Sequence, residues 1–292
     1  MSGRMPGRML RALTSQPQGM VGLCLLALLA AAALLAPVIS PYGPTERVGV
    51  PFQSPDSDHL LGTNDVGHDI LSEIIWGSRA SLSIGVVTAA IATGLGTMVG
   101  LLSGYFGGMV DGLLMRLTDL FLVVPFLPLM ILLAAYLGPS FYNLFLVMAL
   151  LMWARPARVI RSQVLTLRSW TYVEAARAAG AAPGYILRRH ILPGVMSLVV
   201  SQFVMTASLA ILIEASLSFL GLGDPIQKSW GSILFYAQSR SAFLTGAWVW
   251  WVLPPGALIT LTVMGFALTG FALDSALNPR LGRHSAPGLE KN

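Results

Sequence analysis

Long apolar stretches separated by shorter polar segments run through most of this chain. The first, residues 20–39, is long enough to cross a bilayer, which takes about 20 apolar residues. The pattern predicts an all-α integral membrane protein with six transmembrane helices. The expected spans are 20–39, 82–102, 120–137, 142–153, 195–220 and 248–271.

The first stretch has two interpretations. Arg4, Arg8 and Arg11 precede it, as basic residues precede the apolar core of a cleavable signal peptide. The run is longer than the usual core of such a peptide, and many further spans follow. We therefore favour an uncleaved first helix behind a polar tail at residues 1–19.

Composition supports the membrane assignment. Hydrophobic residues make up 55% of the chain and charged residues only 11%, against about 25% charged in soluble domains. The pI near 9.7 raises the question of a nucleic-acid partner. However, the six-helix topology places fourteen of the eighteen Lys and Arg residues on one side, the asymmetry that orients membrane proteins. We expect membrane lipid around the bundle, no nucleic acid, and both termini in the cytoplasm.

This topology divides the chain into five parts. The predicted order is a cytoplasmic tail (1–19), the first transmembrane helix (20–39), an extracytoplasmic loop (40–80), a five-helix transmembrane domain (81–274) and a cytoplasmic tail (275–292). Inside the five-helix domain, residues 154–193 form a long loop with seven arginines and one acidic residue. Such an excess of positive charge places the loop in the cytoplasm.

A helix–turn–helix element is predicted within this basic loop. Thr171 and Glu174 have the spacing of a capping box, with Thr171 as the N-cap. Gly180 tolerates the left-handed conformation that ends a helix, and Pro183 suits the first position of the next one. Alanines give the first helix a small-residue surface, which favours docking of another protein. An amphipathic loop lying on the membrane is the alternative.

The residues of this element resemble a known motif. In the EAA loop of ABC importer permeases, Glu-Ala-Ala is followed after three residues by Gly, and further on by Leu-Pro. The matching positions are Glu174, Ala175, Ala176, Gly180, Leu192 and Pro193.

Two other segments resemble the dipeptide/oligopeptide branch of that family, in its C-type subunit. They are residues 59–72, in the outer loop, and residues 213–223. The outer-loop pattern usually has Asp, Arg and Arg where this chain has Asn64, His68 and Glu73.

The resemblance implies a type I ABC importer transmembrane fold, in which the EAA loop is the coupling helix. It implies a second permease subunit, two cytoplasmic ATPase subunits that bind ATP and Mg²⁺, and an extracytoplasmic solute-binding protein. The expected function is alternating-access import of di- or oligopeptides across the cytoplasmic (inner) membrane. Related importers carry nickel, glutathione or haem instead.

Several membrane positions are candidates for specific roles. Glu214 lies within an apolar span, where an acidic residue faces the bundle interior or water. It lines a translocation path, or it makes an interhelical hydrogen bond, or it already lies near the outer interface. Gly96, Gly100 and Gly104 stand four residues apart, a spacing that allows close helix packing.

We find no catalytic or metal-binding motif. A P-loop needs Gly-Lys followed by Ser or Thr, whereas the only lysines, Lys228 and Lys291, follow Gln and Glu. The outer-loop residues His59, Asp65, His68 and Asp69 have no familiar metal-site spacing. We therefore expect no cofactor bound by this chain. An ATP-independent channel or scaffold, or an intramembrane enzyme, remains as an alternative.

Overall fold

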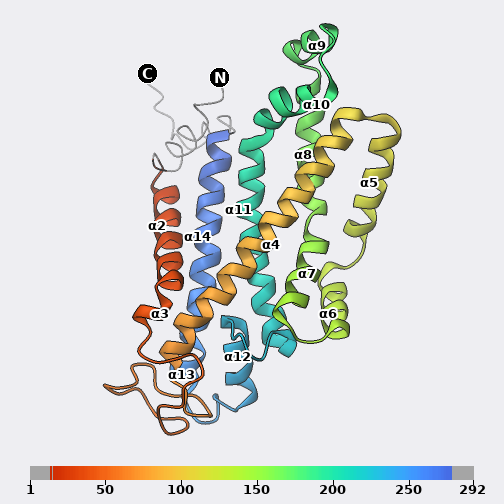
Figure 1. The fold of residues 1–292 in the computed structure, drawn as a ribbon. Coiled ribbons are helices and arrows are strands. Elements are labelled where there is room, and N and C mark those ends of the chain that lie inside the picture. Colours follow the sequence, from red (N-terminus) through yellow and green to blue (C-terminus); the bar gives the residue numbers. More distant parts are fainter. Residues whose placement is uncertain (1–13, 15, 278–292) are drawn as a thin grey trace, which may run out of the picture.

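A computed structural model describes residue 14 and residues 16–277, and these residues form a helical bundle (Figure 1). Most of the two predicted tails lies outside them. The helices are α2 (Pro17–Leu34), α3 (Ala36–Ile39), α4 (Ile70–Phe106), α5 (Gly108–Val123), α6 (Phe126–Leu137), α7 (Phe141–Met152), α8 (Ala154–Arg168), α9 (Thr171–Ala178), α10 (Pro183–Ile186), η2 (Leu187–Ile191), α11 (Leu192–Leu217), η3 (Ser218–Leu222), α12 (Trp230–Ser239), α13 (Trp248–Trp251) and α14 (Leu253–Leu277).

The number of membrane crossings agrees with the six predicted from the sequence. Within the described residues, five helical stretches are long and apolar enough to span a bilayer, and the bent pair α5–α6 makes a sixth if it counts as one span. The continuous stretches include α2, α4, α7 with α8, and α10 through η3, and the last runs from α13 into α14.

The third crossing differs from the prediction. The sequence predicts one transmembrane span at residues 120–137, but this region is divided between α5 and α6, which meet at an angle of 85°. Val124, between them, is extended (φ −69°, ψ 134°). Pro125 follows it, and a proline both lacks an N–H and forces the preceding residue out of the helical region. The helical part of this crossing also begins before residue 120, because the chain turns at Gly107 (φ 68°) and α5 begins at Gly108.

The outer loop is shorter than predicted. Helix α4 begins at Ile70, within the loop expected at 40–80, because Asp69 caps it by accepting a hydrogen bond from the Ser72 backbone N–H (2.8 Å). At 1.5 Å per residue, its 37 residues extend over about 55 Å. That exceeds the hydrocarbon core of about 30 Å. Figure 1 shows α4 crossing the bundle obliquely, with its first turns among the outer segments.

The basic segment 154–193 is mainly helical, not a loop. Its first part is α8, which continues directly from α7. The buried positions recur every three or four residues, which is the spacing of one helix face. The arginines between them make the segment look like a polar loop in the sequence. The buried side chains with this spacing are those of Ala154, Ala157, Ile160, Val164 and Leu167, and Pro156 is buried beside them.

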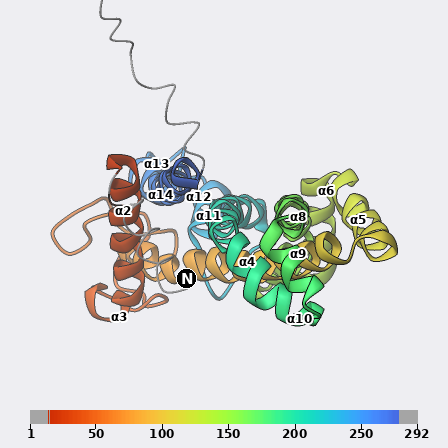
Figure 2. The same ribbon diagram turned by 90° about the horizontal axis from the view of Figure 1, so that it is seen from above.

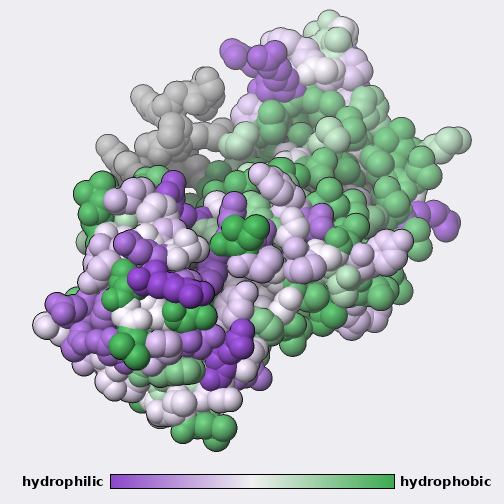
Figure 3. All heavy atoms as spheres, turned by 60° about the horizontal axis from the view of Figure 1, so that its bottom comes forward, coloured by the Kyte–Doolittle hydropathy of each residue, from purple (hydrophilic) through white to green (hydrophobic). Residues whose placement is uncertain are grey.

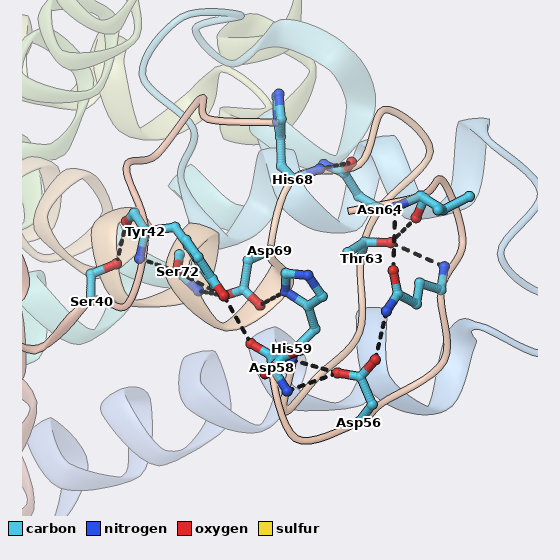
Figure 4. Close-up of polar contacts among 12 residues, drawn as sticks. Ser40, Tyr42, Asp56, Asp58, His59, Thr63, Asn64, His68, Asp69 and Ser72 are labelled. Atoms are coloured by element: carbon cyan, nitrogen blue, oxygen red, sulfur yellow. Dashed lines mark hydrogen bonds and ion pairs between the residues drawn. The ribbon is translucent and has the colours of Figure 1, made fainter. Parts of the chain in front are cut away.

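The outer loop is folded into a polar cap at the end of the bundle opposite α9. Figure 3 shows hydrophilic side chains over this end, and Figure 4 shows contacts that hold it. Two isolated bridges pair Arg47 with His68 and Thr63 with Asp69. The imidazole Nδ1 of His59 lies 3.2 Å from the Asp69 carboxylate. Within the described residues, no group of three or more His, Cys, Asp or Glu side chains could hold a metal ion.

Helix α4 packs against α8 through its glycines. A Cβ added at Gly96 would lie 2.7 Å from the Trp153 carbonyl oxygen, and one added at Gly100 would lie 2.7 Å from that of Ala157. At Gly104 the nearest atom would be the Val164 Cβ, also at 2.7 Å. Contacts this short leave no room for a methyl group. The glycine spacing therefore sets how closely these two helices approach.

We expect Gly100→Ala to destabilise the protein and Gly94→Ala not to. An added methyl at Gly100 overpacks the contact, at a cost of about 1–3 kcal/mol. Gly94 is on the same helix, and a Cβ there would meet nothing within 4 Å. Thermal unfolding of the detergent-purified protein measures the difference. Equal midpoints for the two variants would show that the α4–α8 contact can relax.

Candidate functional site

Helices α9 and α10 form a knob that projects beyond one end of the bundle. Figure 1 places it at the opposite end from the outer loop, α12 and α13, and Figure 2 shows it beside the ends of α4 and α8. Of the motif residues, Thr171, Glu174, Ala175 and Ala176 lie in α9, and Gly180 follows it. Leu192 and Pro193 instead open α11. We call residues 171–186 the coupling knob.

The start of α9 differs from the predicted capping box. Trp170 is the N-cap, and its carbonyl accepts hydrogen bonds from the backbone N–H groups of Val173 (2.8 Å) and Glu174 (3.1 Å). Thr171 is the first helical residue, and no side chain caps the helix. This helix end is exposed, so water can satisfy the unpaired N–H groups that a capping side chain would bond.

The end of α9 is closed by Gly180, as its position predicts. Gly180 has a φ of 79°, and its N–H donates to the Arg177 carbonyl (3.0 Å). The next N–H, of Ala181, donates to the Ala176 carbonyl (3.1 Å). These two bonds form a Schellman motif, which satisfies carbonyls that a helix end otherwise leaves free. A side chain at Gly180 would meet nothing within 4 Å, so backbone conformation, not space, requires glycine here.

One apolar side chain anchors the knob. Val173 is fully buried in a cluster with Ile186, Ile191 and Leu167. These residues come from α9, α10, η2 and α8, so the cluster joins the knob to two helices of the bundle. Ala176 and Leu192 pack against the same cluster. Two residues of the EAA motif therefore fix the knob in place instead of facing outward.

The outward face of the knob is made of small residues with aromatic residues around them. Glu174, Ala175 and Gly180 are exposed. Close by, the Trp170 and Tyr172 rings are 5.7 Å apart between centroids. The His190 ring lies 5.8 Å from Tyr172 and 5.7 Å from Tyr185. Partly exposed aromatics beside small residues are typical of protein-binding surfaces.

Sequence analysis did not single out these aromatic residues or the Val173 anchor. The aromatic side chains come from three separate segments, so only the folded chain brings them together. Val173 is one apolar residue between polar and small ones, and no periodic pattern marks it.

Three arginines of the basic segment hold the helices at this end. Arg161 forms a two-pronged ion pair with Asp111 (both N–O distances 2.5 Å), and Arg158 pairs with Asp119. Both acids lie in α5, so these pairs link α5 to α8. Arg168 donates to the Gly104 carbonyl at the end of α4 (3.1 Å). From the sequence alone, no specific role beyond membrane orientation could be assigned to each of these arginines.

Glu214 lies in α11, far from the knob, and is buried. Its carboxylate accepts hydrogen bonds from the hydroxyls of Ser218 (2.8 Å) and Ser81 (3.4 Å). Ser81 belongs to α4, and it also accepts the Trp230 backbone N–H (3.1 Å). Glu214 thus forms an interhelical hydrogen bond between α11 and α4, and its place on a translocation path stays a prediction.

The three departures from the outer-loop motif contact one another. Glu73 is buried, and its Oε1 atom accepts a hydrogen bond from the Asn64 side-chain amide (2.9 Å) and lies 3.2 Å from His68 Nδ1. The same oxygen pairs with the Lys228 ammonium. Asn64 and His68 thus both contact Glu73. Through Lys228, this cluster also connects the outer loop and α4 to the segment before α12.

Known families and proteins match most of the chain. A profile for binding-protein-dependent transport system inner membrane components matches residues 96–283. A second profile, for the N-terminal transmembrane domain of oligopeptide transport permease C, matches residues 7–61.

Curated relatives span nearly the same length. A putative peptide transport system permease of Brucella suis is 38% identical over 263 residues, covering 89% of this chain and 87% of the relative. A dipeptide transport system permease of Bacillus subtilis is 34% identical over 276 residues (94% and 85%). A glutathione transport system permease of Pectobacterium atrosepticum is 38% identical over 230 residues (78% and 75%).

The helical bundle, its crossings and these matches lead to one conclusion. This chain is a multi-pass inner-membrane protein that belongs to the family of binding-protein-dependent transport system inner membrane components, the permeases of ABC transporters.

Proposed function

We propose that this chain is one of two permease subunits of an ATP-driven importer of peptides or related small solutes. Relatives named as dipeptide and oligopeptide transport permeases support the cargo class. A relative named as a glutathione transport permease supports including related small solutes, since glutathione is itself a small modified peptide. The partners are a second permease, two cytoplasmic ATPases that hold ATP and Mg²⁺, and an extracytoplasmic solute-binding protein.

The observation that carries this proposal is the coupling knob. It exposes a small-residue face while Val173 is buried beneath it. A partner can therefore approach the backbone of the knob closely. Because Val173 packs in a cluster with residues of α8 and α11, a displacement of the knob moves these two helices. This arrangement suits force transmission from an ATPase. An isolated channel has no need of it.

The orientation follows from charge. The arginines of the basic segment belong to α8, α9 and η2, around the knob. Because cytoplasmic segments carry the excess of Lys and Arg, the knob and both termini are on the cytoplasmic side. The folded polar loop then faces the binding protein. Hydrolysis of ATP takes place in the partner subunits, and alternating access moves the cargo.

A pull-down tests docking at the knob. Glu174→Arg introduces a bulky positive charge at an exposed knob position, and we expect it to release the co-purifying ATPase from the permease pair. Glu46→Arg makes the same charge change on the exposed outer loop and should retain the ATPase. Equal retention by both variants would place the ATPase contact elsewhere. Transport that persists without any ATPase would favour a channel.

Gly180→Trp should abolish cargo-stimulated ATP turnover without unfolding the bundle. The tryptophan side chain projects from the docking face, where nothing else fills the space. It also strains the left-handed backbone, so Gly180→Asn is the control, because asparagine tolerates that conformation with a small side chain. We expect Gly180→Asn to keep most of the turnover. Normal stimulation in Gly180→Trp would contradict the docking role.

A further inference from the structure

A cavity of about 490 Å³ lies at the outer end of the bundle, away from the coupling knob. One wall is a face of the first turns of α4, with Glu73, Trp76, Arg79 and Ser83. The opposite wall is the segment before α12, with Gln227 and Lys228. Small-molecule sites commonly occupy about 300–1,000 Å³. The cavity therefore has room for a small organic molecule.

The lining carries more positive than negative charge. Arg79 and Lys228 face a single carboxylate, that of Glu73. That carboxylate is already bonded by Asn64 and Lys228, with His68 beside it. Its charge is thus compensated within the wall. An ammonium group has three donors, so Lys228 keeps donors beyond the one that Glu73 accepts.

Of the two cations that line the cavity, Arg79 is the more exposed. No carboxylate of the described residues forms an ion pair with it. Its guanidinium carbon lies 5.4 Å from the centre of the Trp76 ring, a cation–π contact that orients the group. A held guanidinium presents paired N–H donors that match the two oxygens of a carboxylate. The ligand chemistry that fits this cavity is therefore an oxyanion, and a carboxylate is the oxyanion that a peptide cargo supplies.

We propose that this cavity binds the carboxylate of a small cargo molecule, such as the C-terminus of a peptide, at the outer mouth of the permease. The inference rests on the proposed import function. Two observations favour a cargo over an acidic side chain of the binding protein. The volume exceeds what one side chain fills, and the lining combines an aromatic ring with aliphatic Pro44 and Ile226. Such a mixture is typical of small-molecule sites.

The test uses the complete transporter, with its binding protein, in proteoliposomes. Uptake of dialanine is compared with uptake of its C-terminal amide, and the ratio of the two kcat/KM values measures carboxylate discrimination. Because every permease variant meets the same binding protein, that protein's own preference cancels between variants. Arg79→Gln should lower the ratio about ten-fold, the size expected for loss of a charge-assisted hydrogen bond. Arg79→Lys, which keeps the charge without the paired donors, should give an intermediate ratio.

Arg240→Gln is the matched control. Arg240 is also on the outer side, but it pairs with Asp65 (3.1 Å) and does not line the cavity. It should keep the wild-type ratio. An unchanged ratio in Arg79→Gln, with normal thermal stability, would overturn the inference. So would an equal loss for both probes together with weaker stimulation of ATP turnover by the binding protein, since that result assigns Arg79 to protein docking. Wild-type vesicles in which ATP drives no uptake of dialanine, of longer peptides or of glutathione would refute the proposed function itself.

Discussion

The close contact between α4 and α8 is the constraint on which the rest of this structure depends. Gly96, Gly100 and Gly104 let the two backbones approach until no Cβ would fit between them. Helix α8 leads through one short turn into the coupling knob, whereas α4 begins in the outer cap beside the Glu73 cluster. Held at this contact, α4 connects the end of the bundle that carries the knob to the end that carries the polar cap, and Arg168 bonds to the Gly104 carbonyl near the end of α4.

The structure also shows how three departures from a family pattern remain compatible with the fold. Asn64, His68 and Glu73 each differ from the outer-loop motif, and a buried Glu73 without partners would be costly. Here the three contact one another, and Lys228 adds a cation from a segment more than 150 residues away. The changes form one group, so the cap keeps its shape with a different set of charges.

Much of this architecture could be predicted because it is local. Hydropathy gives the spans, the i, i+4 glycines mark a packing face, and Gly180 ends α9 by its own backbone freedom. The failures are equally specific. By residue type Thr171 is the better N-cap, but Trp170 takes that position, because a short sequence pattern does not fix a helix boundary to one residue. The arginines of α8 made residues 154–168 look like part of a polar loop, so the apolar face of this helix was not predicted. The Arg161–Asp111 pair and the Ser81–Glu214 bond join residues that are far apart in sequence, so only the folded chain reveals them.

The Schellman closure at Gly180 has a consequence for any subunit that docks at the knob. Both terminal hydrogen bonds are made within the chain, and Val173 is already buried. The element holds its shape before contact, so little conformational entropy is lost on association. A movement of the docked subunit is then passed to the knob as a whole and is not lost in rearranging the surface that the subunit contacts.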